Sequence, residues 1–168
     1  SAGYALAAES EFEVYYDDDL FPVFAFFDRK ISRHFSLGIR GGYMSEKGEM
    51  RTVSGASTEL STEWMTVPVS VSANWNFPVV PDVWGFVGIG PDYWFIREQV
   101  EASGSNGDVE EWVGGYHGRA GLWLFNQNPE YRNWGALLEC NYHQIDRFGQ
   151  NDINPGGWIF SLGVFYGF

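Results

Sequence analysis

The sequence is short of cysteine and of basic residues, and both shortages exclude something. Its single cysteine, Cys140, cannot form a disulfide within the chain. Lys30 and Lys47 are the only lysines, and acidic residues outnumber basic ones by 22 to 10, which gives a net charge of −12 at pH 7. Because a strongly acidic protein is repelled by phosphate backbones, we expect no nucleic-acid partner.

Long apolar runs are also missing. The longest, Leu20–Phe27, is interrupted by Pro22 and falls far short of the roughly 20 residues of a membrane-spanning helix. The chain is rich instead in aromatic residues and glycine, with 8 Trp, 9 Tyr, 14 Phe and 21 Gly. Because glycine weakens helices, this composition favours β-structure.

The clearest strand signal is the segment Trp158–Phe168. Its even-numbered residues are all apolar or aromatic, whereas its odd-numbered residues are mostly small. Alternate residues of a strand point to opposite faces, so one face of this strand is continuously apolar, as a lipid-facing strand requires. A similar alternation recurs in Phe35–Tyr43, Met65–Phe77, Val83–Phe95, Trp112–Leu124 and Trp134–Tyr142.

Two further strands are expected near the start of the chain. Over residues 6–16, Glu9, Glu11 and Glu13 alternate with apolar residues. Around Phe21–Phe27 both faces are apolar, so the alternation does not assign the direction of these side chains.

The connections between these segments alternate in length. The compact ones, rich in proline and asparagine, are Asp28–Arg33, Phe77–Asp82 and Asn126–Asn133, and the longer polar ones are Ser45–Ser61, Glu98–Glu111 and Ile145–Gly156. Short turns at one end and long loops at the other are typical of bacterial outer-membrane barrels.

The sequence therefore predicts an all-β fold, an eight-stranded antiparallel up-and-down transmembrane β-barrel, as a single domain over residues 1–168. The longer loops are expected outside the cell and both termini in the periplasm. No secretory signal is visible at Ser1, so we expect a mature chain.

Aromatic residues are expected to form two girdles at the membrane interfaces, because a ring with a polar edge favours the headgroup level. The girdle near the longer loops comprises Trp64, Tyr93, Trp94, Trp112, Tyr142 and Trp158, and that near the compact turns Phe35, Trp75, Phe77, Trp134 and Phe168.

The chain resembles the small eight-stranded outer-membrane barrel families, the relatives of OmpX, OmpW and the OmpA membrane domain. The segment Val67–Phe95, which contains VWGFVGIGPDYWF, is similar to their glycine-and-aromatic hairpin, and the closing GGWIFSLGVFYGF resembles their C-terminal strand. The resemblance implies that Tyr166 and Phe168 belong to a signal read by the barrel-assembly machinery. It implies no single function, because these families include adhesins, enzymes and channels.

A soluble barrel of lipocalin type is the alternative interpretation of the alternation. That fold turns apolar side chains inward and polar ones outward. Here the predicted inner face carries Arg40, Asp92, Arg119 and Glu139, and the opposite face carries Leu, Val and Trp. A charged interior with an aliphatic exterior suits lipid rather than water.

The face predicted to point inward is unusually charged. Its members are Glu9, Glu11, Glu13, Arg40, Asp92, His117, Arg119, Glu139 and His143. A barrel of eight strands is filled by its own side chains, and buried charges must pair because an isolated one costs several kcal/mol. We expect this set to plug the barrel; the alternative is a narrow polar path or a proton-sensitive gate with the histidines as switches.

An enzymatic site is not expected. The pair Tyr142-His143 followed by Asn154-Pro155-Gly156 faintly resembles the lipid A deacylases, whose motif has a serine where this chain has Ile145. Without that nucleophile the triad is incomplete, and the inward direction predicted for His143 turns it away from lipid, so we expect no catalytic residue.

No metal or cofactor is expected either. The run Asp17–Asp19 has oxygen ligands suited to Ca²⁺, but a solvated turn is the commoner role of a charge run. No His/Cys spacing of a zinc site is visible.

The expected function is that of an outer-membrane β-barrel with a filled polar interior and a structural or interaction role, such as the anchor or a subunit of a surface assembly. A narrow small-solute or ion pore and a lipid A deacylase-like enzyme are the alternatives. The expected partners are outer-membrane lipid, lipopolysaccharide, the barrel-assembly machinery and other surface proteins.

Overall fold

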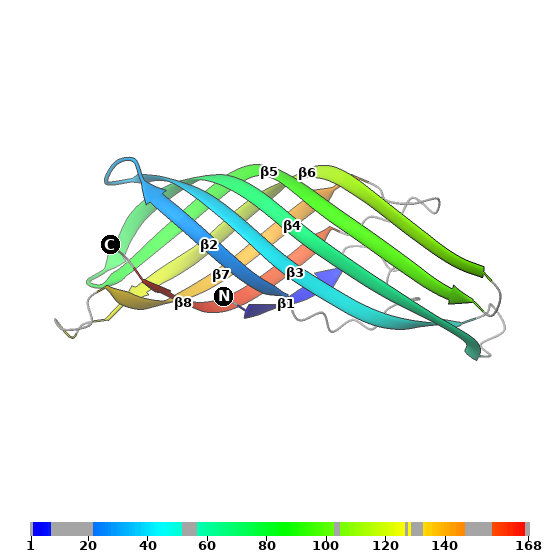
Figure 1. Ribbon diagram of the computed structural model, residues 1–168. Coiled ribbons are helices and arrows are strands. Elements are labelled where there is room, and N and C mark those ends of the chain that lie inside the picture. Colours follow the sequence, from blue (N-terminus) through cyan, green and yellow to red (C-terminus); the bar gives the residue numbers. More distant parts are fainter. Residues whose placement is uncertain are drawn as a thin grey trace.

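A computed structural model describes residues 2–7, 22–51, 57–102, 105–126, 128, 133–146 and 156–166. These residues form eight strands, β1 (Ala2–Ala7), β2 (Val23–Lys30), β3 (Phe35–Arg51), β4 (Ser57–Val80), β5 (Val83–Ala102), β6 (Ser105–Phe125), β7 (Trp134–Ile145) and β8 (Gly157–Tyr166). Each strand pairs antiparallel with the next, and β1 pairs with β8, so the sheet closes into a barrel (Figure 1). The predicted eight-stranded up-and-down barrel is confirmed.

In the part of the chain that the structure describes, no helix has the length and apolar character needed to cross a membrane.

The compact turns gather at one end of the barrel, together with the end of β8 (Figure 1). Between β4 and β5 only Pro81 and Asp82 make the turn. Asp82 has a positive φ of 64°, a conformation that Asp adopts more readily than most residues. The predicted compact connection Phe77–Asp82 therefore ends where expected, although its first residues still belong to β4.

The prediction of long irregular loops over Ser45–Ser61 and Glu98–Glu111 is largely wrong. Strand β3 continues to Arg51 and β4 begins at Ser57, while β5 runs to Ala102 and β6 starts at Ser105. The strands stay paired far along these segments, with Lys47 opposite Glu63 and Ala102 opposite Ser105. The polar sequence does not end the strands, because backbone pairing does not depend on apolar side chains.

The side chains divide between the two faces of the wall as the alternation predicts. Leu122, Leu138 and Leu162 lie side by side in the register of β6, β7 and β8, and all three are exposed on the outer wall. Arg40 and Glu139, in contrast, are buried inside. An aliphatic exterior around a charged interior excludes the lipocalin-type alternative and requires a lipid environment.

The first two strands could be assigned only in part from the sequence. On β2 the structure turns Phe24 inward and Phe27 outward. The first strand occupies Ala2–Ala7, earlier than the predicted residues 6–16, and residues 8–21 lie outside the described residues.

The two predicted aromatic girdles are confirmed in part: Tyr142 is half-buried, and Phe168 lies outside the described residues. Tyr93, Trp112 and Trp158 are exposed near the long hairpins, and Phe35, Trp75 and Trp134 are exposed near the compact turns. Trp64 and Trp94 were assigned to the first girdle, and this was wrong, because both are buried inside the barrel. Their even numbers on β4 and β5 place them on the inward-facing side of those strands.

Candidate functional site

The interior of the barrel is the candidate site, and its side chains lie in successive layers. Near the compact turns, Phe86, Leu137 and Phe165 are buried together, with Trp123 and Phe125 packed against them. The Trp123 and Phe165 rings meet edge to face with centroids 5.0 Å apart. We call these five residues the turn-side aromatic layer. The side chains of this layer pack against one another and fill the interior of the barrel at that end.

A polar cluster around Asp28 lies between β2, β3 and β4. Asn74 donates a hydrogen bond from Nδ2 to Asp28 Oδ1 over 2.8 Å, and Ser36 donates from Oγ to the same oxygen over 3.4 Å. Asn76 donates from Nδ2 to Ser36 Oγ over 3.0 Å. Asp28 was predicted to lie in a turn, and β2 had no assigned direction, so this inward carboxylate was missed.

Farther from the turns, Glu139 accepts hydrogen bonds from two arginines. Its Oε1 pairs with Nη1 of Arg40 and its Oε2 with Nη2 of Arg119, and all three side chains are buried. One carboxylate thus bridges β3 and β6 from its place on β7. We call these three residues the arginine–glutamate network.

Neighbouring side chains make further hydrogen bonds with both the donors and the acceptor of this network. Arg40 donates from Nη2 to Ser161 Oγ over 3.2 Å, and Arg119 donates from Nη1 to Ser72 Oγ over 3.1 Å. Asn141 donates from Nδ2 to Glu139 Oε1 over 2.9 Å. Buried charges persist only when they are paired and hydrogen-bonded in this way. The network therefore joins strands β3, β4, β6, β7 and β8 through side chains.

The guanidinium of Arg40 also lies over an aromatic ring. Its Cζ is 3.7 Å from the centroid of Phe24 on β2, a cation–π geometry. Arg119 lies similarly over Phe86, at 4.8 Å. Each guanidinium thus contacts an aromatic ring in addition to the Glu139 carboxylate.

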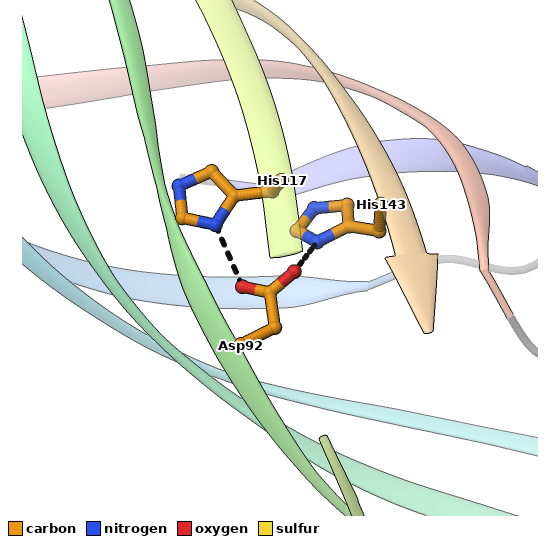
Figure 2. Close-up of side chains that lie close together, drawn as sticks. All are labelled: Asp92, His117 and His143. Carbon is orange, nitrogen blue, oxygen red and sulfur yellow. Dashed lines mark hydrogen bonds and ion pairs between the residues drawn. The ribbon is translucent and has the colours of Figure 1, made fainter. Parts of the chain in front are cut away.

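A second cluster lies two residues from Arg119 on β6 and four residues from Glu139 on β7. His117 and His143 face each other across these strands, and their Nδ1 atoms lie 2.7 Å from Oδ1 and Oδ2 of Asp92 on β5. Figure 2 shows both rings turned toward the same carboxylate. All three residues are buried, Asp92 completely. We call Asp92, His117 and His143 the His–Asp cluster.

A second apolar layer follows toward the long hairpins. It comprises Phe24, Met44, Trp64, Trp94, Ile96, Val113, Ile145 and Ile159, all buried. The Trp94 ring meets His143 with centroids 5.4 Å apart. Because this loop-side apolar layer borders the His–Asp cluster, the charged side chains lie between two apolar layers.

The structure brings together six residues of the predicted interior set, Arg40, Asp92, His117, Arg119, Glu139 and His143, in the two adjacent groups just described. The predicted Glu9, Glu11 and Glu13 lie outside the described residues, as does Phe168. Tyr166 is exposed on the outer wall, 5.1 Å from the Trp134 ring by centroids.

The deacylase-like pattern has no counterpart in this geometry. His143 points inward and contacts Asp92, and Ile145, at the position of the serine in that motif, is buried in the loop-side apolar layer. Neither residue reaches the lipid-facing wall, where a lipid substrate would lie.

No protein-family model matches the sequence, and no curated protein matches it. The fold, however, matches solved structures over nearly its whole length. Neisserial surface protein A (NspA) superposes with a TM-score of 0.66 at 16% identity, covering 99% of this chain and 93% of its own. This chain has the fold of the small eight-stranded outer-membrane β-barrels.

A second similar structure is Ail, the attachment invasion locus protein of Yersinia pestis, crystallised with the heparin analogue sucrose octasulfate. It has a TM-score of 0.57 at 13% identity and is matched over 98% of this chain and 94% of its own. The resemblance inferred from the sequence is therefore confirmed for the architecture. At these identities the likeness establishes the fold alone.

Proposed function

We propose that this chain is a non-enzymatic protein of the bacterial outer membrane that displays its long hairpins outside the cell as an interaction surface. The compact turns and both termini face the periplasm in this arrangement. The filled barrel serves as the anchor that holds the hairpins at the surface.

The observation that carries the proposal is the length of the central strands. Strands β4, β5 and β6 have 24, 20 and 21 residues. Crossing a membrane in a barrel takes about 9–11 residues. The strand residues in excess of this number lie beyond Trp112 and remain paired, with Glu98 opposite Val109 and Glu101 opposite Asn106. A paired hairpin that extends beyond the lipid can present side chains to a partner.

The interior supports a structural role rather than transport. Two apolar layers enclose the arginine–glutamate network and the His–Asp cluster, and every side chain of these two ionic groups is buried and paired. The alternative, a narrow pore for ions or small solutes, needs a hydrated path across both apolar layers.

The names of the similar structures support a function at the outer surface of the cell. One is called a surface protein and the other an attachment invasion locus protein bound to a sulfated sugar. A polyanion of that kind suits this chain poorly, because acidic residues such as Glu98, Glu101 and Glu110 lie on the hairpin and the net charge is −12. We expect a surface protein or cation-bridged lipopolysaccharide instead.

Photo-cross-linking in whole cells tests the proposal. A photoreactive amino acid at Val109, on the extended hairpin, is expected to yield adducts with a surface protein or with lipopolysaccharide. The same group at Leu162, on the lipid-facing wall, is the control and should yield lipid adducts. Absence of adducts from position 109 would overturn the proposal. So would a labelling experiment in which residue 109 reacts only with reagents that are confined to the periplasm.

Conductance across a planar bilayer tests the filled interior separately. The purified barrel is expected to give no steady single-channel steps. Steps that vanish in an Arg40→Ala or Arg119→Ala variant would support the pore instead.

A further inference from the structure

We propose that Asp92, His117 and His143 form a binding site for a first-row divalent transition-metal ion such as Zn²⁺. The three side chains come from adjacent strands β5, β6 and β7 and turn toward one another (Figure 2). One donor atom of each lies within 4.8 Å of the other two. The site lies inside the barrel, apart from the surface to which the function is assigned.

The donor atoms define the class of ion. Two imidazole nitrogens and one carboxylate oxygen suit Zn²⁺ and its first-row neighbours. Calcium and magnesium prefer shells made of oxygen alone, which this cluster does not offer. Three protein ligands leave one position of a tetrahedral shell for a water molecule.

The spacing of the donors is close to what such an ion needs. The Nδ1 atoms of His117 and His143 each lie 2.7 Å from an oxygen of Asp92. Metal–ligand bonds of about 2.0–2.2 Å in a tetrahedral shell put ligand atoms roughly 3.3 Å apart. To bind an ion in place of the Nδ1 protons, each imidazole has to move roughly half an ångström away from the carboxylate. The donor atoms, which lie within 4.8 Å of one another, have to reach the same spacing.

The backbone keeps the three ligands in place. His117 and His143 are directly opposite in the register of β6 and β7, and the residues opposite Asp92 and His117 across β5 and β6 are Gly115 and Gly90. A Cβ at Gly90 would meet the backbone of β4, and one at Gly115 the backbone of β7, so the strands approach closely beside the cluster. Ligands held on paired strands need little reordering to bind.

The Asp92 carboxylate is the negative ligand of the cluster. The described contacts of the Asp92 carboxylate are to the two imidazoles, whereas both buried guanidiniums of the neighbouring layer bind Glu139. A buried carboxylate must be compensated. The neighbouring network, with two guanidiniums and one carboxylate, leaves one positive charge that acts on Asp92 from the next layer. A metal ion bound at the two imidazoles would place positive charge in direct contact with the carboxylate, where the Nδ1 protons otherwise lie.

The surroundings suit a permanently held ion rather than an exchanging one. The loop-side apolar layer covers the cluster, with Trp94 against His143, and the arginine–glutamate network lies on the other side. An ion that enters during folding would link β5, β6 and β7 and resist removal by chelators afterwards. The bound ion would therefore have a structural role, as a cross-link between three strands of the barrel.

Metal analysis of the refolded barrel tests the inference. The untagged protein is refolded into detergent with Zn²⁺ and excess Mg²⁺, which occupies surface carboxylates, and is then dialysed against metal-free buffer. About one Zn²⁺ per barrel is expected to remain. His117→Gln and His143→Gln should each weaken retention at least about tenfold, since even loss of an outer hydrogen-bond partner commonly costs that much. Heat-modifiable gel migration shows whether each variant is folded.

His34 provides the matched control. The chain has three histidines, and His34 is the one outside the cluster: it lies in the turn before β3 and stacks on Trp75. His34→Gln should keep full Zn²⁺ retention. Equal retention in all three variants, or loss in His34→Gln alone, would overturn the proposal.

Imidazole NMR signals test the site without any substitution. The unaltered barrel has three histidines, so Zn²⁺ is expected to shift two of the three imidazole signals and leave that of His34 in place. Unshifted signals of His117 and His143 in protein refolded with Zn²⁺ would show that protons, not a metal, occupy the cluster, and would sink the inference.

Discussion

Gly42 lies against the ring of Phe24, so closely that a Cβ at residue 42 would come 2.3 Å from Cδ1 of that ring. Phe24 is at the same time the ring that supports the Arg40 guanidinium. The missing side chain at Gly42 is therefore what allows an aromatic residue and an arginine to stack inside a narrow barrel.

Gly42→Ala should destabilise the barrel by about 1–3 kcal/mol, because overpacking displaces the Phe24 ring and the guanidinium over it. The adjacent Gly41 faces outward, and a Cβ added there would meet nothing within 4 Å, so Gly41→Ala is the matched control and should change stability by less than about 0.5 kcal/mol. Urea unfolding in phospholipid vesicles, followed by tryptophan fluorescence, measures both. Equal effects of the two substitutions would contradict the packing described.

Glu139→Gln should cost about 3–5 kcal/mol, because it leaves two buried guanidiniums without their carboxylate. Glu110→Gln is the comparison, since Glu110 pairs with Arg97 over 3.1 Å in an exposed position and should cost no more than about 1 kcal/mol. The same unfolding experiment applies. A Glu139 variant as stable as the Glu110 variant would show that the interior charges are hydrated rather than tied together.

Leu162→Arg should lower stability by about 2–4 kcal/mol in vesicles, because residue 162 lies in the middle of the lipid-facing wall and is 62% exposed there. Val109→Arg should cost about 0–1 kcal/mol, because residue 109 lies beyond Trp112 and outside the apolar band. Reversible unfolding from vesicles gives both free-energy changes. A larger loss of stability for Val109→Arg than for Leu162→Arg would show that the lipid-facing band had been assigned to the wrong part of the barrel.

Shortening the β5–β6 hairpin should separate the anchor from the surface function. Replacing residues 98–109 with an Asn-Gly turn joins Arg97 to Glu110, which are already opposite each other. The shortened barrel should keep its heat-modifiable migration and lose the adducts expected from the hairpin. Loss of heat-modifiable migration would mean that the extension is needed to fold the wall.

Deletion of Phe168 tests the proposed assembly signal. The deleted chain should accumulate less in the outer membrane of cells and yet refold normally from urea into detergent, because only assembly in the cell involves the machinery. The substitution Trp134→Phe, on the neighbouring strand, is a control that should change neither result. A refolding defect in vitro would show a structural role for the C-terminal residue instead.

The direction of side chains could be predicted from sequence because a strand has a strict period of two. Leu162 and Arg40 were placed correctly on that basis. Strand length could not be predicted in the same way, because Glu98 and Val109 pair through backbone groups whether lipid or water surrounds them. On β2, where both faces are apolar, the period gave no signal, and the inward Asp28 was missed.

Contacts inside the barrel depend on register, which the sequence did not supply. Asp92, His117 and His143 were each predicted to point inward, but their separations of 25 and 26 residues along the chain form no local motif. They meet because the turns between β5, β6 and β7 set particular pairings. A shift of two residues in either pairing would keep every side chain on its face and separate the three.

The pairing of β1 with β8 has a consequence for how the chain enters a membrane. Ala2–Ala7 hydrogen-bond to Gly157–Leu162, residues that are synthesised much later. Until the two meet, both strands carry unpaired amide and carbonyl groups that hydrocarbon cannot accommodate. Insertion and ring closure must therefore happen as one event, and a chain stalled before its final strand has no stable place in the bilayer.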